Sequence, residues 1–399
     1  MGGDMNQYTF TKRSQNVPDA GIGPIMSYAA KYSDTISLGQ GAPQFKTPQF
    51  VYDQLYEQSK TNPTLGIYNN LNDKTQLALK ELLVTDFKSK YLFAPQISEL
   101  YLTVGGIGGL FAALMVLLQK GDEVIFFDPS YPLHLSQISI SEAKPVFVPL
   151  NESSGWTLDL ELLKSKVTNK TKAIVLTNPN NPTGTVLSKD QIHQLAEIVV
   201  DRRLYLVLDE AYEYLTYDQP LYSPMNIPKL RDHIVLSKSF SKEYAMTGWR
   251  IGYLWANTEI IKKIQSIHLY FSLNPATIAV AAATIVLSDP QGKQAMLDFK
   301  AQITKSREVI CQRMDRLTKL FSYQKPQGSF YLFPKIIPDI PAFDFAKKLV
   351  DEAKVITIPG DSMGTSGAHH LRMSFSANSK VINQAFDRLD QFAKDNNYS

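Results

Sequence analysis

The stretch HIVLSKSFSKEYAMTGWRIGYLW, residues 233–255, holds two short apolar runs joined by a loop rich in Ser, Lys and Gly. The runs HIVLSKS (residues 233–239) and IGYLW (residues 251–255) contain consecutive aliphatic and aromatic residues rather than a strict apolar–polar alternation. Strands buried on both faces have this pattern, and they occur in mostly parallel sheets that helices cover on both sides. The stretch therefore predicts an α/β domain.

Four upstream runs extend this pattern, with helical stretches between them. They are YLTV (101–104), EVIFFD (123–128), KAIVLTN (172–178) and YLVLDE (205–210). Downstream of residue 275 the pattern changes to a long helical segment, 294–320, followed by three strand-like runs and the helical stretch 343–353. The three runs are SFYLFPKI (329–336), VITIPG (355–360) and LRMSFS (371–376). This part predicts a smaller α+β domain.

The predicted organisation has three parts. Residues 1–45 hold little regular pattern and several Gly and Pro, so we expect an N-terminal arm that also forms part of the small domain. Residues 46–285 form the predicted large domain, and residues 286–399 form the small C-terminal domain.

Composition excludes several classes of protein. The 399 residues carry 41 basic and 38 acidic side chains, a net charge of +3, without a long run of like charge that would predict a nucleic-acid partner. The single cysteine, Cys311, permits no intrachain disulfide and no thiolate metal site, and a cytoplasmic location is expected. The apolar stretches 105–118 and 275–287 are shorter than the roughly 18–20 residues of a membrane span, so no membrane association is predicted.

Lys242 is the candidate nucleophile. It follows a buried-looking strand, lies among Ser, Thr and Gly, and precedes Arg250 by eight residues (250 − 242). A second cation nearby lowers the pKa of a lysine amine, which then forms a Schiff base with an aldehyde more readily. A surface lysine after a strand is far commoner, so this position needs support from other motifs.

A glycine-rich turn provides the first support. In TVGGIGGLFAALMVLL a strand ends at Val104, glycines follow at 105, 106, 108 and 109, and an apolar helix begins. Backbone amides at such a helix N-terminus bind phosphate. A tight turn that needs glycine only for its positive φ explains the same residues.

Three further motifs carry polar or aromatic side chains suited to a charged aromatic ligand. Asp209 in VLDEAY ends a buried strand and could pair with a protonated ring nitrogen, or it could cap a following helix. Tyr212, the last residue of VLDEAY, and Asn181, in NPNNPTG, could reach a phenolic oxygen, although NPNNPTG also suits a simple loop. Tyr131 in DPSYPLH could stack on a ring, or could be a core tyrosine.

In their order and spacing, NPNNPTG, DEAY and SKSFSKEYAMTGWRIGY resemble the class I/II aminotransferases of the aspartate aminotransferase superfamily. The resemblance runs from LGQGAP near residue 38 to LRMSFS near residue 376. It implies pyridoxal 5'-phosphate (PLP) fold type I, in which a mostly parallel seven-stranded sheet flanked by helices forms the large domain. It also implies PLP as the cofactor and a homodimer with shared active sites.

The resemblance assigns a role to each matching residue. Lys242 is the Schiff-base lysine, Asp209 pairs with the pyridine nitrogen, and Tyr212 completes the catalytic set. The cofactor-binding positions also include Tyr131 as ring stacker, Asn181 at the phenolic oxygen, Gly105, Gly106, Ile107, Ser239 and Arg250 at the phosphate, and Tyr68 from the other subunit. The substrate carboxylate is expected at Arg372, with Gly41 and Asn181 beside it. No metal is expected.

The implied reaction is a ping-pong transfer of an amino group from an L-amino acid to a 2-oxo acid, with Lys242 as general base. Leu269 stands where animal-type aspartate enzymes carry a second arginine, and Ile107 where some bacterial ones carry a lysine. An acidic substrate side chain would therefore stay unpaired, which is costly, so neutral or aromatic amino acids are favoured.

Two alternatives remain open from the sequence. A PLP-dependent lyase or cyclase, which performs β-elimination or amino-acid cyclisation, would share Lys242, Asp209 and Arg372. A non-catalytic regulator of the same fold would usually carry an added DNA-binding domain, and the chain has no spare basic segment for one.

Overall fold

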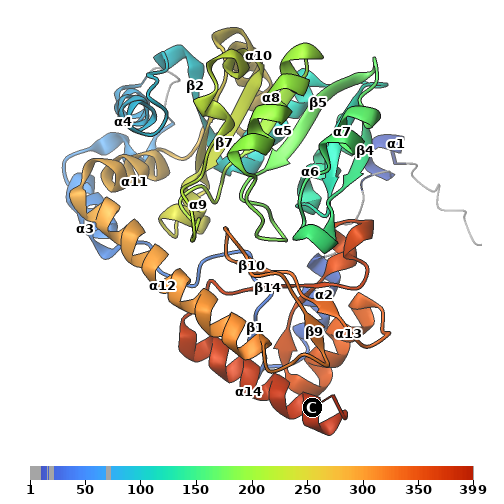
Figure 1. The fold of residues 1–399 in the computed structure, drawn as a ribbon. Coiled ribbons are helices and arrows are strands. Elements are labelled where there is room, and N and C mark those ends of the chain that lie inside the picture. The colour runs from blue at the N-terminus through green and yellow to red at the C-terminus, as the bar shows by residue number, and fades with distance from the viewer. Residues whose placement is uncertain (1–9, 16, 18–21, 69–72, 399) are drawn as a thin grey trace, which may run out of the picture.

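The computed structural model describes residues 10–15, 17, 22–68 and 73–398. Its larger part is a seven-stranded sheet with helices on both faces (Figure 1). The strand order is β2-β8-β7-β6-β5-β3-β4, and β8 alone runs antiparallel to its neighbours. The strands are β2 (Leu100–Val104), β3 (Glu123–Asp128), β4 (Lys144–Pro149), β5 (Thr171–Thr177), β6 (Tyr205–Asp209), β7 (Ile234–Ser239) and β8 (Ile251–Trp255). The predicted mostly parallel α/β sheet is confirmed.

Both faces of the sheet are buried, as the continuous apolar runs predicted. In β3, Val124 and Phe126 pack into one apolar cluster, whereas Ile125 and Phe127 pack into the cluster on the opposite face. Helices α5, α6 and α10 contribute to the first cluster and α4, α7, α8 and α11 to the second. Their bounds are α4 (Lys74–Tyr91), α5 (Gly105–Leu117), α6 (Pro132–Ile140), α7 (Leu160–Lys166), α8 (Lys189–Asp201), α10 (Thr258–Ser272) and α11 (Thr277–Ser288).

Strand β4 did not stand out in the sequence. Its KPVFVP pattern contains two prolines, and of its six residues only Val148 is buried. It lies at the edge of the sheet, where a missing N–H donor is tolerated. A half-exposed, proline-containing edge strand therefore lacks the continuous apolar run that identified the other six.

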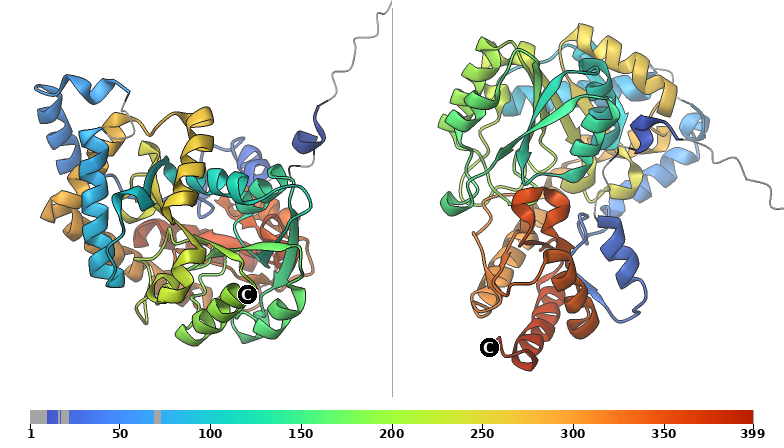
Figure 2. Two further views of the ribbon diagram at one scale, coloured as in Figure 1. Left: turned by 90° about the horizontal axis from the view of Figure 1, so that it is seen from above. Right: turned by 90° about the vertical axis from the view of Figure 1, so that its right-hand side faces the viewer.

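The C-terminal part forms a smaller α+β unit below the sheet, seen in orange to red in Figures 1 and 2. Its helices are α12 (Pro290–Met314), α13 (Ala342–Lys348) and α14 (Ser379–Asp395), and a π-helical turn, Leu349–Ala353, continues α13. Its strands are β9 (Phe321–Ser322), β10 (Tyr331–Leu332), β11 (Lys335–Ile336), β12 (Val355–Ile356), β13 (Ile358–Pro359) and β14 (Leu371–Ser374). The order β10-β14-β13 places two of these strands beside β14, which carries Arg372.

The N-terminal segment packs onto this smaller unit. Strand β1 (Ile36–Ser37) pairs in parallel with β12, and α2 (Ile22–Ala29) contacts α13. The remaining α-helices are α1 (Lys12–Gln15), α3 (Gln49–Ser59) and α9 (Phe240–Glu243). This pairing agrees with an N-terminal arm that contributes to the small domain, while the boundaries at residues 45 and 285 stay a prediction.

One predicted helix begins earlier and ends earlier than its sequence pattern. Helix α12 starts at Pro290 rather than at residue 294, because the Asp289 side chain accepts a hydrogen bond from the backbone N–H of Gln291 and proline suits the first helical turn. It ends at Met314 rather than at residue 320.

Within the described ranges, no helix has both the length and the apolar character that crossing a membrane requires.

Candidate active site

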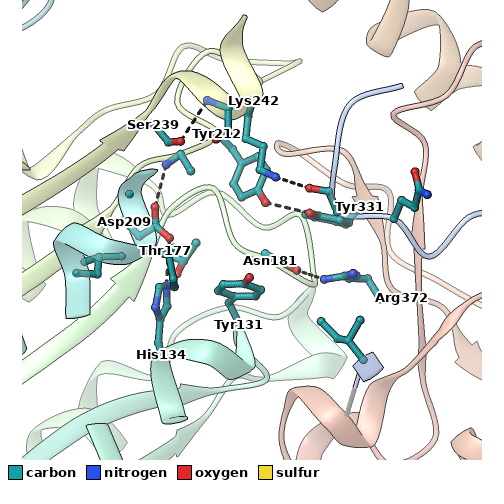
Figure 3. Close-up of a pocket in the computed structure, with 18 of the residues that line it drawn as sticks. Tyr131, His134, Thr177, Asn181, Asp209, Tyr212, Ser239, Lys242, Tyr331 and Arg372 are labelled. Atoms are coloured by element: carbon teal, nitrogen blue, oxygen red, sulfur yellow. Dashed lines mark hydrogen bonds and ion pairs between the residues drawn. The ribbon is translucent and has the colours of Figure 1, made fainter. Parts of the chain in front are cut away.

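A cavity of about 330 Å³ lies where the carboxyl ends of three parallel strands face the smaller unit (Figure 3). The last residues of β5, β6 and β7, which are Thr177, Asp209 and Ser239, all line it. Tyr331 of β10 and Arg372 of β14 close the opposite side. Ligands of open α/β sheets bind at this edge, so the topology itself places a binding site here.

Most of the residues predicted for the site line this one cavity. They are Gly41, Gly106, Ile107, Tyr131, Asn181, Asp209, Tyr212, Ser239, Lys242, Arg250 and Arg372. Gly105 lies directly behind the wall, against Arg250. Tyr68 lies outside the cavity, just after the 3₁₀ turn Pro63–Gly66, with 84% of its surface exposed.

Lys242 extends from the short helix α9, which directly follows β7. Its Nζ donates a hydrogen bond to the carbonyl oxygen of Gly41. Burial, together with the positive charges of Arg372 and Arg250, lowers the pKa of this amine to about 8, and the carboxylate of Asp209 opposes the decrease. An amine with this pKa is partly neutral near pH 7–8, which a nucleophile or a general base requires.

Asp209 is held by two contacts at the end of β6. Its Oδ1 accepts a hydrogen bond from the Ala211 N–H at 3.1 Å, and its Oδ2 lies 3.1 Å from Nε2 of His134. The residues after Asp209 form a turn rather than a helix, so Asp209 does not cap one. Sequence reasoning missed His134, although it lies in the first turn of α6, directly after the predicted ring stacker Tyr131 at the N-cap.

The glycine turn predicted to bind an anion (the anion cup) forms the N-terminus of α5. Gly105 has φ = +67°, and a Cβ there would lie 2.5 Å from Nη2 of Arg250, so only glycine lets the guanidinium approach the turn. Ser239 and Ser241 line the same end of the cavity, and the Ser241 N–H donates to Oγ of Ser239. Backbone amides, hydroxyls and one arginine together suit a phosphate dianion.

Two tyrosines and Asn181 lie between the cup and Arg372 (Figure 3). The Tyr131 ring is edge-on to His134, with ring centroids 5.2 Å apart. The Tyr212 hydroxyl lies 2.9 Å from the hydroxyl of Tyr331, a residue that the sequence did not single out. Burial raises the pKa of Tyr212 far above its ordinary value, so this hydroxyl stays protonated and can donate a hydrogen bond.

Arg372 is almost fully buried, with 2% of its surface exposed. Its Nη1 donates to Oδ1 of Asn181 at 3.1 Å, and its Nη2 donates to the carbonyl oxygen of Gly39 at 3.0 Å. Its Nε is buried and has no hydrogen-bond partner in the structure. A buried guanidinium with donor capacity and no carboxylate partner fits a carboxylate ligand.

The comparisons with known proteins agree with this geometry. The family model for aminotransferase class I and II matches residues 33–389, and the chain belongs to this family. It is 30% identical to an aspartate aminotransferase of Pyrococcus horikoshii over 97% of this chain and 98% of that protein. It is 29% identical to aromatic-amino-acid aminotransferase 2 of Thermococcus litoralis over 96% and 98% of the two chains. The solved alanine aminotransferase of Pyrococcus furiosus superposes with a TM-score of 0.89 at 27% identity, covering 97% and 100%.

The protein is accordingly an enzyme of the aminotransferase class, whose members depend on PLP. The cavity fits that cofactor chemically. It offers an anion cup for a phosphate, a carboxylate for a ring nitrogen and a buried amine for an aldehyde, within one space. Among the described residues, the cavity included, no group of three His, Cys, Asp or Glu side chains is placed to hold a metal ion.

Proposed function

We propose that this aminotransferase binds PLP in the cavity between β5–β7 and β14, through the residues predicted from the sequence. The observation that carries the proposal is the buried amine of Lys242, which shares one cavity with Asp209 and Arg372. When bound, the cofactor supplies an aldehyde that takes up the amino group and a ring that withdraws electrons from the substrate Cα.

The chain's own residues orient the substrate and move its proton. Arg372 binds the α-carboxylate with its guanidinium and so turns the Cα–H bond toward Lys242. Lys242 would take the proton from the substrate Cα as general base and hold it at Nζ. Asp209, fixed by His134 and Ala211, would pair its carboxylate with the ring nitrogen, and Tyr212 and Asn181 would donate hydrogen bonds to the phenolic oxygen.

We propose a neutral or aromatic amino acid as the preferred amino donor. The apolar side chains of Ile22, Met26, Ile107 and Leu110 line the cavity. Arg13, which could have supplied a distal cation from the N-terminal arm, instead pairs with Glu142 at 2.8 Å. An acidic side chain would therefore lose its hydration without gaining a partner from these residues.

We further propose a homodimer whose sites include Tyr68 of the second subunit. The surface of one chain exposes several large apolar residues along α10 and beyond, and exposed apolar patches mark sites of protein–protein contact. The exposed residues are Ile67, Tyr68, Leu269, Tyr270, Phe271, Leu273 and Ile278. Pairing of this surface with a second copy would bring Tyr68 toward the other subunit's phosphate cup.

Two measurements test the function. Borohydride reduction of the PLP-loaded protein should attach a pyridoxyl group to Lys242, located by peptide mass mapping. The loaded protein is then mixed with single amino acids: aspartate, glutamate, glutamine, methionine, phenylalanine and kynurenine. Conversion of the cofactor band to that of pyridoxamine reports transamination and ranks the donors. A pyridoxyl group on another lysine would overturn the proposed site, and release of products without pyridoxamine formation would favour the lyase or cyclase reaction instead.

A further inference from the structure

Tyr331 contacts both Tyr212, on the cofactor side of the proposed site, and Arg372, on the substrate side, and it has no role in the proposed function. This residue lies in β10, is 1% exposed and lines the cavity. Its hydroxyl is 2.9 Å from the hydroxyl of Tyr212. Its ring lies beneath the guanidinium of Arg372, whose Cζ is 4.6 Å from the ring centroid. Figure 3 shows Tyr331 between these two residues.

The two hydroxyls share a limited number of protons. Burial raises the pKa of both Tyr212 and Tyr331, so each hydroxyl keeps its single proton near neutral pH. One proton forms the hydrogen bond between them, and one remains for a further acceptor. If an anionic oxygen accepts the proton of Tyr212, Tyr331 must be the donor within the pair. A chain of hydrogen bonds in this direction polarises Tyr212 and strengthens its donation.

The backbone around the pair leaves Tyr331 little freedom. A Cβ built on Gly41 would lie 3.1 Å from the Tyr331 hydroxyl oxygen and 3.9 Å from Nη2 of Arg372. The carbonyl of the same glycine accepts the hydrogen bond of Lys242. The hydroxyl is thus fixed between Gly41 and Tyr212, and the ring is fixed beneath Arg372.

We propose that Tyr331 is a positioning residue with two functions: its hydroxyl directs the Tyr212 proton to the cofactor's phenolic oxygen, and its ring orients Arg372 for the substrate carboxylate. This inference rests on the proposed function, since it assumes PLP at Lys242. Through this one side chain, the smaller unit that carries β10 would influence both the protonation of the cofactor and the binding of the substrate.

The two functions are separable by substitution. Tyr331→Phe keeps the ring and removes the hydroxyl, whereas Tyr331→Leu removes both. The readout for the hydroxyl is the pH titration of the cofactor absorbance band in the resting, PLP-loaded protein. A hydrogen bond to the phenolic oxygen favours the form that has lost its proton, so weakening that bond raises the midpoint. The readout for the ring is KM for the amino acid, measured beside kcat.

We expect Tyr331→Phe to raise the midpoint by roughly 0.3–1 pH unit and to leave KM within about twofold of the unsubstituted protein. Tyr331→Leu should raise the midpoint similarly and also raise KM by about tenfold, because the cation–π contact is lost. In a Tyr212→Phe background, Tyr331→Phe should shift the midpoint no further, since the effect passes through Tyr212.

Each opposite result overturns one part of the inference. An unchanged midpoint in Tyr331→Phe, or an additive shift in the double variant, removes the role of the hydroxyl. An unchanged KM in Tyr331→Leu removes the role of the ring. If Tyr331→Leu does not fold, the affinity of Tyr331→Phe for a substrate-like carboxylate tests the ring instead. This variant keeps the ring, so it should bind the carboxylate as tightly as the parent protein does. A different affinity would contradict the proposal that the ring alone orients Arg372. Failure of the parent protein to attach PLP at Lys242 would instead overturn the proposed function.

Discussion

At the scale of single residues, the site is organised by charges around one amine. Lys242 is flanked by two cations, Arg250 and Arg372, and by one carboxylate, Asp209. Burial and the two arginines disfavour the ammonium form, and Asp209 favours it. Removing an arginine should therefore raise the pKa of Lys242, and removing the carboxylate should lower it.

The amine pKa provides the first test. In the cofactor-free protein, acetylation of Lys242 by a trace reagent should rise with pH around a midpoint of about 8, because only the neutral amine reacts. An unperturbed lysine has a midpoint near about 10.4. Arg372→Gln should move the Lys242 midpoint upward and Asp209→Asn downward, measured by mass spectrometry of the labelled peptide. Shifts of the same sign in both variants would contradict the charge balance.

Ile107 provides the second test, on substrate choice. It lines the cavity at the start of α5, as Ile22 and Met26 do, and the Lys and Arg side chains that line this cavity in the described chain are Lys242, Arg250 and Arg372. Ile107→Lys should raise kcat/KM for aspartate about 10- to 100-fold by pairing the buried carboxylate. Ile107→Met is the matched control and should leave aspartate turnover low. High aspartate turnover in the unsubstituted protein would show that another cation already pairs the substrate.

At the scale of elements, a buried ionic cluster supports β6, which ends at Asp209, and β7, which leads into the helix α9 that carries Lys242. Lys238 of β7 lies 3.4 Å from Glu210, the residue after β6, and also contacts Glu213. Its Nζ donates to the hydroxyl of Tyr91 at 2.6 Å, which connects the two strands to α4. Burial lowers the pKa of Lys238 to about 8, and the carboxylate of Glu210 opposes the decrease.

Lys238→Met should destabilise the fold, because it leaves the carboxylate of Glu210 buried without its cation, whereas Glu213 keeps Lys90 as a partner at 2.7 Å. The loss should be roughly 3–5 kcal/mol in the free energy of unfolding, as for other broken buried pairs. Denaturant unfolding of the cofactor-free protein measures it. Lys262→Met removes an exposed partner of Glu259 at 2.9 Å and should leave the midpoint unchanged. Equal stability of the two variants would show that the cluster contributes little.

The sequence predicts those elements and site residues whose pattern lies within one short stretch of chain. Six of the seven sheet strands are visible as apolar runs, and Lys242, Asp209 and the glycine turn follow from motifs beside those strands. Tyr331 and His134 escape the same reasoning, because their importance comes from contacts across 119 and 75 residues of chain. A lone Tyr in a two-residue strand, or a lone His in a short helix, has no local pattern that distinguishes it from a core residue.

At the scale of the whole molecule, the cavity lies between two units whose sequences are far apart. β14 and the N-terminal residues Gly39 and Gly41 meet β5–β7 only in the folded chain, and Arg372 donates to Gly39 across 333 residues. One predicted site residue, Tyr68, does not line this cavity and is largely exposed. A second copy of the chain would supply it if the dimer surface is as proposed.

Subunit mixing tests this shared site. Lys242→Ala removes the amine of a site, and Tyr68→Ala removes the group proposed to enter the other subunit's site, so each homodimer should have little activity. Random mixing of the two variants gives heterodimers with one site that carries both defects and one that carries neither. Activity should then recover to about a quarter of the unsubstituted value, since about half of the dimers are mixed and each has one intact site. A mixture of Lys242→Ala with Lys242→Arg should recover nothing, because every site lacks its lysine. If Tyr68 acts within its own chain, mixing restores no activity in either pair, and full activity in a stable monomer would refute the dimeric site altogether.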